Sequence, residues 1–143
     1  INIELLNDLN SLEFYKKEHP KSLGLEWVKT EILPLVDSYN LQVNDILRTL
    51  IEHISIQITK EINKKSNVTV LITGGGVYND FLIKSIKDKT KNEMVIPNQL
   101  IIEFKEALIF GFLGVLKLRD EVNCLSSVTG AFKNHSSGKI YIH

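Results

Sequence analysis

The residues best suited to chemistry in this chain form the stretch Gly74-Gly75-Gly76-Val77-Tyr78-Asn79. A β-branched and apolar run precedes the glycines and an amphipathic pattern follows them, which predicts a strand, a tight turn and a helix. Glycine has no Cβ, so the backbone can take positive φ and a ligand can approach closely. A helix beginning here would direct N–H groups and the positive end of its dipole toward the turn, which suits a phosphate. A sharp turn without a ligand fits the same pattern, so both interpretations stay open.

Familiar nucleotide and catalytic motifs do not match this stretch. A dinucleotide-binding turn would need a third glycine where Asn79 stands, and an acidic residue at the end of the next strand, whereas Glu93 opens that strand. A P-loop needs Gly-Lys-Ser/Thr after the glycines, and none follows. The sequence also has no G-x-S-x-G elbow and no His/Cys cluster at metal-ligand spacing.

Four further side chains have reactive groups but stand alone in the sequence. Glu106 opens an apolar segment, where a carboxylate is either an exposed residue of the first turn or a polar group facing a site. Cys124 is the single cysteine, which excludes an internal disulfide and fits a reducing compartment. His19 is expected in a loop, since no partner ligands for a metal are seen, and His53 neighbours an apolar stripe and is expected to be packed or half-exposed.

Composition places the chain among ordinary globular domains. It has 143 residues, of which 43% are hydrophobic and 24% charged. Seventeen basic and seventeen acidic side chains cancel, which argues against a partner such as nucleic acid or an anionic membrane. The longest apolar run, residues 107–116, is far shorter than the roughly 20 residues of a membrane span, so we expect a buried helix there.

The amino-terminal residues carry no targeting signal that we recognise. Residues 1–4 lack the charged and apolar regions of a signal peptide. The chain also lacks an initiator methionine, so we expect it to be a processed or excised piece of a longer protein.

Helical patterns precede the glycine turn. Apolar residues at spacings of three and four predict a helix over residues 1–15 and a second over residues 27–33, which Pro34 should end or kink. The strongest helix pattern covers residues 40–62. Its apolar side chains form one wide stripe, expected to face the core, of Val43, Ile46, Leu47, Leu50, Ile51, Ile54, Ile58 and Ile62.

The elements around and after the turn indicate an α/β fold. A helix should run to about Lys87 and a second strand should cover residues 93–97, so the strand-helix-strand order implies a right-handed crossover and a parallel sheet. A last long helix is expected over residues 103–118. Gly111 and Gly114 would each cost it about 1 kcal/mol, which indicates a close approach by another helix or a ligand. A turn-rich stretch at residues 126–131 and a final strand at residues 139–142 complete the pattern.

Five spaced motifs, in order across nearly the whole chain, resemble those of the bacterial anhydro-N-acetylmuramic acid kinases. Pro20-Lys21-Ser22-Leu23-Gly24-Leu25-Glu26 resembles P-K-S-T-G-R-E, and Asp45 with Thr49-Leu50 resembles D-x-x-x-T-L. The glycine turn through Asn79 resembles G-G-G-x-x-N. Glu106-Ala107 with Phe110 resembles E-A-x-x-F, and Ser127-Val128-Thr129-Gly130-Ala131 resembles S-V-T-G-A.

The resemblance implies a fold and a place for this chain within it. Residues 1–143 would be a single domain, the helix-rich C-terminal lobe of a two-lobe kinase with an actin-like (ribonuclease H-like) ATPase fold. The amino-terminal lobe, with its G-T-S-x-D-G motif and catalytic aspartate, lies outside this sequence, as do strands that would extend the sheet. Leu23 and Leu25 replace the family's Thr and Arg, so no anion-binding role is carried over to that loop.

The resemblance also implies a function. The whole protein would use ATP, with Mg²⁺ bound mainly through the phosphates, to convert 1,6-anhydro-N-acetylmuramic acid into N-acetylmuramic acid 6-phosphate during cell-wall recycling in the cytoplasm. Gly74, Gly75, Gly76 and Asn79 would bind the nucleotide, and Glu106 would reach the sugar or the cleft. This chain alone would be inactive, and family members are often homodimers. The alternative is a non-catalytic nucleotide- or partner-binding module.

Overall fold

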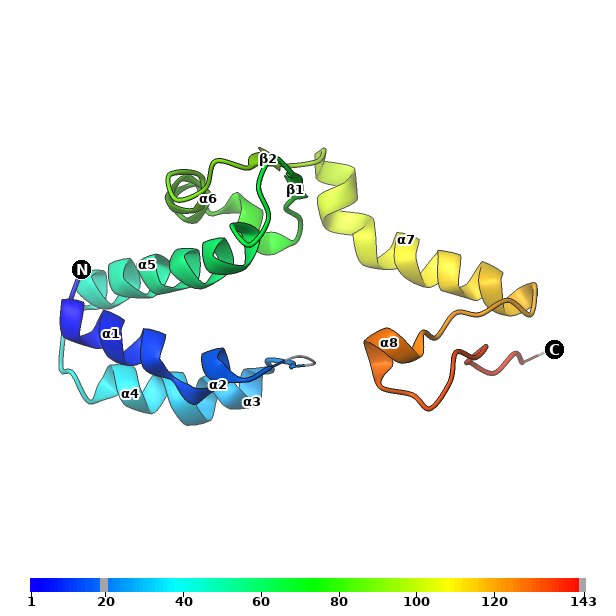
Figure 1. Cartoon of the computed structure of the whole chain (residues 1–143), viewed down its shortest axis with the longest axis horizontal. Helices are drawn as coiled ribbons and strands as arrows, with labels where there is room; N and C mark the ends of the chain where they lie inside the picture. Colours follow the sequence, from blue (N-terminus) through cyan, green and yellow to red (C-terminus); the bar gives the residue numbers. More distant parts are fainter. Residues whose placement is uncertain (19–20, 142–143) are drawn as a thin grey trace. The chain divides into compact units, whose positions relative to one another are not determined.

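The computed structural model describes residues 1–18 and 21–141. The chain divides into two compact units, Ile1–Pro97 and Asn98–His143. Both are rich in helix, and the first holds a short parallel sheet (Figure 1). The α/β class expected from the sequence is confirmed at this level, whereas the single domain over residues 1–143 stays a prediction.

The first unit begins with short helices. α1 (Ile3–Ser11) starts at Asn2, whose side chain accepts a hydrogen bond from the Leu5 N–H at 2.8 Å. Leu12 leaves the helical conformation, with ψ of 139°, and so ends α1. α2 (Glu13–Lys16) begins at the next residue. The single helix expected over residues 1–15 is therefore divided in two.

The segment around Pro34 continues as helix where the sequence predicted an end or a kink. α3 (Leu25–Trp27) leads into the π-helix η1 (Val28–Ile32) and then α4 (Leu33–Asp37). The Leu33 N–H donates to the Val28 carbonyl five residues back, so the widened turn lies directly before the proline. Pro34 then occupies the first turn of α4, a position where a residue with no N–H to donate is tolerated.

The hydrophobic core of this unit lies between α1, the η1–α4 segment and α5 (Val43–Ile62). Figure 1 shows α1 between α4 and α5. The buried residues of this core are Leu5, Leu9, Ile32 and Val36, and Ile46 and Leu50 of α5 pack against them. These two positions confirm part of the stripe predicted for the long helix.

Four other positions of that stripe contradict the prediction. Val43, Leu47, Ile54 and Ile58 are exposed, and α5 instead buries Thr49, His53, Ser55 and Thr59. Burial of the hydroxyls is inexpensive because each donates to a carbonyl of its own helix: Thr49 to Asp45, Ser55 to Glu52 and Thr59 to Ser55, at 2.7 to 2.8 Å. This 20-residue helix therefore has an exposed apolar face, the α5 stripe, formed by Val43, Leu47, Ile54 and Ile58.

The parallel sheet is confirmed, with shorter strands than expected. β1 (Thr69–Leu71) pairs with β2 (Glu93–Val95) in the register Thr69↔Glu93 and Leu71↔Val95. The crossover between them contains η2 (Gly75–Tyr78) and α6 (Asp80–Lys87). Asn92 is buried just before β2, and its side-chain amide donates to the carbonyls of Ile62 and Lys65. This amide fixes the entry of β2 against the end of α5.

Polar contacts hold α6 against α5. The Ser85 hydroxyl donates to the Ser55 hydroxyl at 2.9 Å in a buried position. The Lys89 ammonium lies 3.0 Å from the half-buried Glu52 carboxylate, which Arg48 also contacts at 3.3 Å. Because these bonds are directional, they fix both the distance between the helices and their register.

The second unit contains α7 (Gln99–Leu118) and α8 (Ser126–Thr129), with an isolated antiparallel bridge between Cys124 and His135. The buried helix expected over residues 107–116 is contradicted, since no described residue of α7 is buried; a unit with so few elements cannot cover a 20-residue apolar helix on all sides. The final strand is also wrong for residues 139–141, and Ile142 lies outside the described residues. No helix among the residues described is long and apolar enough to cross a membrane.

Candidate functional site

The glycine turn is a tight connection whose backbone bonds to itself. Gly74 has φ of +95°, a conformation that favours glycine. The Val77 N–H donates to the Gly74 carbonyl and the Asn79 N–H to the Gly76 carbonyl, both at 3.1 Å, which forms the 3₁₀ turn η2. The α-helix therefore begins at Asp80, and the prediction that it begins directly after the glycines is wrong.

The backbone of this turn is open to approach. Gly75 and Gly76 are exposed, and a Cβ built on any of the three glycines would meet no atom within 4 Å. Val77 anchors the turn, because its side chain is buried. The turn thus presents bare peptide groups above an apolar anchor, as a backbone contact with a ligand requires.

Asn79 joins the turn to α6. Its side-chain oxygen accepts a hydrogen bond from the Leu82 N–H at 3.0 Å, the usual arrangement of a helix N-cap. The Asn79 N–H donates to the Gly76 carbonyl, and the Asn79 carbonyl accepts from the Ile83 N–H. Of the polar groups of Asn79, only the side-chain NH₂ is not engaged in these bonds.

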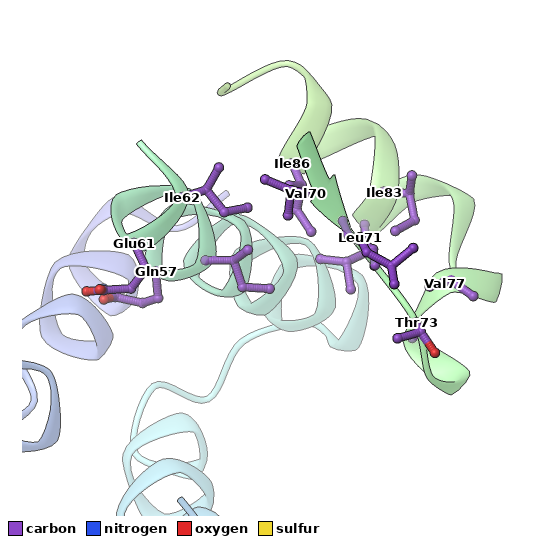
Figure 2. Close-up of a pocket in the computed structure, with 13 residues that line it drawn as sticks. Gln57, Glu61, Ile62, Val70, Leu71, Thr73, Val77, Ile83 and Ile86 are labelled. Carbon is purple, nitrogen blue, oxygen red and sulfur yellow. The ribbon is translucent and has the colours of Figure 1, made fainter. Parts of the chain in front are cut away.

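An apolar cavity of about 650 Å³ lies beside the turn. Figure 2 shows Val70 and Leu71 of β1, Ile62 of α5, and Ile83 and Ile86 of α6 around it. Gly76 and Val77 of the turn also line it. No sequence pattern marks this cavity, since it depends on how α5, β1 and α6 pack against one another.

Thr73 is a second feature that the sequence analysis did not single out. It directly precedes Gly74 and lines the cavity, and its hydroxyl oxygen is buried with no hydrogen-bond partner. A buried hydroxyl without a partner costs free energy, on the order of 1–3 kcal/mol. Its position between the strand and the glycines is the only signal in the sequence that could have drawn attention to it.

His53 is packed, as expected. Its Nδ1 lies 2.8 Å from Asn10 Oδ1, which also accepts from Gln57, and its Nε2 lies 2.9 Å from the Tyr15 hydroxyl. Because Asn10 Oδ1 can only accept, Nδ1 carries the proton and Tyr15 donates to Nε2. Burial lowers the pKa of the His53 imidazole to about 4 and raises the pKa of Tyr15. The network ties α1 and α2 to α5.

The remaining candidates are Glu106, Cys124 and His19. Glu106 is exposed on α7 in the second unit, whereas the turn and its cavity belong to the first. Cys124 is a half-exposed free thiol, and His19 lies outside the described residues. Over residues 1–18 and 21–141, no three His, Cys, Asp or Glu side chains are grouped so that they could hold a metal ion.

The two leucines that depart from the motif pattern face solvent. Leu25 opens α3 and is 64% exposed, and Leu23 is also exposed where it borders a second apolar cavity of about 350 Å³ that includes Trp27.

Thr49 is fully enclosed, and its hydroxyl accepts from the Asn2 N–H at 3.0 Å. Thr49 therefore joins α5 to the start of α1 and is remote from solvent.

Comparison with known proteins agrees with the motif series. The family model described as anhydro-N-acetylmuramic acid kinase matches residues 1–143. Curated proteins named anhydro-N-acetylmuramic acid kinase are similar to this chain: one from Sulfurimonas denitrificans is 29% identical over 98% of the chain, and one from Psychrobacter cryohalolentis is 32% identical over 95%. The chain covers 41% and 35% of these two relatives, so it spans about two fifths of their length. The chain belongs to the anhydro-N-acetylmuramic acid kinase family.

Proposed function

We propose that this chain is the adenosine-binding lobe of an ATP-dependent kinase for 1,6-anhydro-N-acetylmuramic acid, with an actin-like fold. The observation that carries the proposal is the turn at residues 74–76. Its peptide groups are exposed, and the space where a Cβ would stand is empty at all three glycines. A nucleotide can therefore lie against the backbone itself, where N–H groups reach phosphate or ribose oxygens without a side chain in between.

The proposed reaction is a phosphoryl transfer coupled to ring opening. Water opens the 1,6-anhydro ring while O6 of the sugar takes the γ-phosphoryl group, giving N-acetylmuramic acid 6-phosphate and ADP in cell-wall recycling. The base that activates the water and the loop that grips the phosphates are assigned to the rest of the protein. Mg²⁺ offsets phosphate charge in such transfers and is proposed to bind through the phosphates.

Glu106 is proposed to act at the sugar side of the cleft. It matches the first position of the E-A-x-x-F motif, and its carboxylate is exposed on α7. An exposed carboxylate on a rigid 20-residue helix can accept hydrogen bonds from sugar hydroxyls without first breaking an internal contact. The proposal gives Glu106 a binding role and leaves the proton transfers to groups outside this chain.

We further propose that the rest of the protein completes the sheet at β1. In the described residues the sheet has two strands of three residues each, too few for a stable parallel sheet on its own. The α5 stripe and the cavity beside β1 are both apolar and uncovered. Extended segments added along the free edge of β1 would cover them together and bring partners to the Thr73 hydroxyl.

Sheet completion predicts a change in hydrogen exchange. The backbone amides of Thr69–Leu71 should exchange at least tenfold more slowly in the whole protein than in the isolated chain, because strands paired on both edges open less often. Amides of α1, which packs within this unit, serve as the internal control. Equal exchange rates at β1 in the two proteins would show that this edge stays free.

A second candidate function is a nucleotide- or partner-binding module without catalysis. Leu23 and Leu25 favour it, because they remove a hydroxyl and a guanidinium from a loop and leave an exposed apolar surface there. Such a protein would keep the glycine turn and would lose turnover even at full length.

The isolated chain should bind ATP and show no kinase turnover, while the whole protein should do both. The binding groups are proposed to lie in this chain, whereas the catalytic base and the phosphate loop lie elsewhere. Titration calorimetry with an ATP analogue and the anhydro-sugar measures binding, and a coupled assay for ADP measures turnover. Turnover by the isolated chain would contradict this division, and binding without turnover by the whole protein would favour the second candidate.

A further inference from the structure

We propose that Asn79 is a positioning residue, which serves the nucleotide through the shape of the glycine turn and makes no direct contact with the ligand. This inference rests on the proposed function of the turn. Asn79 stands where the 3₁₀ turn ends and α6 begins, and three of its polar groups are engaged there. Its N–H donates to Gly76, its carbonyl accepts from Ile83, and its side-chain oxygen accepts from Leu82.

Both elements that the turn connects are held from elsewhere. β1 is paired with β2, and α6 is fixed to α5 by the Ser85–Ser55 hydrogen bond and the Lys89–Glu52 ion pair. These contacts lie on the strand, at Ser85 near the end of α6, and at Lys89 just after it. They set where the turn must start and finish, and they leave its internal shape undetermined.

No packing supplies the missing restraint over the glycines. A Cβ on Gly75 or Gly76 would have no neighbour within 4 Å, so nothing covers that part of the turn. Its shape therefore depends on the buried Val77 side chain, on the bond from the Val77 N–H to the Gly74 carbonyl, and on the hydrogen bonds that Asn79 makes to both sides. Without the side-chain bond to Leu82, the first turn of α6 frays, and the Asn79 N–H loses its fixed direction toward Gly76.

Serine and alanine at this position separate the two roles. Serine is an N-cap residue comparable to asparagine but has no NH₂ group, while alanine does not cap. Asn79→Ser should therefore keep the affinity of the chain for the ATP analogue AMP-PNP within threefold, and Asn79→Ala should weaken it at least tenfold. Asn98→Ala is the matched control, because Asn98 caps α7 with the same bond, to the Ile101 N–H at 3.0 Å, in the other unit.

The experiment combines calorimetry with amide exchange by NMR. In the nucleotide-free chain, the amide of Val77, which donates to the Gly74 carbonyl, should exchange at least tenfold faster in Asn79→Ala than in wild type, and at the wild-type rate in Asn79→Ser and Asn98→Ala. Equal losses of affinity in Asn79→Ser and Asn79→Ala would overturn the inference, because the NH₂ group would then contact the ligand. Wild-type affinity in Asn79→Ala would overturn it as well. If wild type itself does not bind AMP-PNP, the proposed function fails, and the exchange rates still decide whether Asn79 sets the turn.

Discussion

Gly75→Val in the whole protein is expected to raise the KM for ATP at least tenfold while leaving the thermal unfolding temperature unchanged. Gly75 has no positive φ, and a side chain there would enter empty space, so the fold can accept valine. The same space is where the nucleotide is proposed to meet the backbone. Two added methyl groups and a Cβ would hold the ligand away from the N–H groups of the turn, and hydrogen bonds to phosphate are lost with distance.

Gly74→Val is the matched control for backbone strain, because the conformation of Gly74 is one that favours glycine. With φ of +95° it occupies a region that side chains rarely adopt, so Gly74→Val should lower the stability of the protein by about 1–3 kcal/mol. Thermal unfolding and steady-state kinetics on both variants distinguish strain from obstruction. An unchanged KM in Gly75→Val would remove the glycine turn from the nucleotide site.

Local pattern was enough to predict the turn and the sheet around it. A β-branched run that ends in three glycines, followed by Asn79 and Asp80, contains signals that act over a few residues: strand propensity, freedom at Gly74 and a helix N-cap. The parallel pairing of β1 with β2 followed from element order alone. The exact start of α6 was missed, although the capping asparagine was visible, because the intervening 3₁₀ turn has no strong pattern of its own.

Burial was predicted less well, for a reason seen on α5. Its apolar side chains identified a helix face, and the prediction assumed that the widest apolar face is the covered one. Within this unit α5 is instead covered along positions such as Thr49 and Ser55, whose hydroxyls are satisfied by their own helix. Which face is covered depends on the elements available to cover it, and neither propensity nor periodicity contains that information. The exposed face of α7 has the same explanation.

The cavity and the Thr73 hydroxyl show the same limit at the candidate site. The glycines could be identified from type and spacing, because their chemistry is local. The cavity needs α5, β1 and α6 in place, and the orphaned hydroxyl becomes informative only when its surroundings are known. The sequence could therefore predict that the peptide groups of the glycine turn carry no side chains. The apolar cavity beside them could be found only in the structure.

Acid is expected to destabilise the first unit through His53. Burial lowers the pKa of its imidazole from the ordinary 6.5 to about 4, so between these values the unfolded chain binds a proton that the folded chain does not. The free energy of unfolding is therefore unaffected by this residue above about pH 6.5, and falls as the pH drops from about 6.5 to about 4. The full shift corresponds to a loss of about 3 kcal/mol, a large part of the stability of a domain this size.

The physical cause is the arrangement of the network. Asn10 Oδ1 accepts the proton on Nδ1, and the Tyr15 hydroxyl donates to Nε2, so a second proton on the ring would meet the Tyr15 hydrogen. His53 is only 3% exposed, and water cannot solvate the added charge without opening the contact of α1 and α2 with α5. Protonation and separation of these helices are thus expected to occur together.

Trp27 makes the measurement specific to this region. It is the single tryptophan of the chain, and its ring lies 5.9 Å from that of Tyr15, so its fluorescence reports on the helices that the network joins. Urea unfolding followed at Trp27 from pH 7.5 to pH 4.5 should show the loss in wild type and a much flatter profile in His53→Gln. Glutamine keeps one donor for Asn10 and one acceptor for Tyr15 but does not titrate. Other acid-sensitive groups contribute equally to the profiles of both proteins, so the difference between the profiles belongs to His53. If the two profiles have the same slope, the acid sensitivity belongs to carboxylates elsewhere and the network makes no contribution to it.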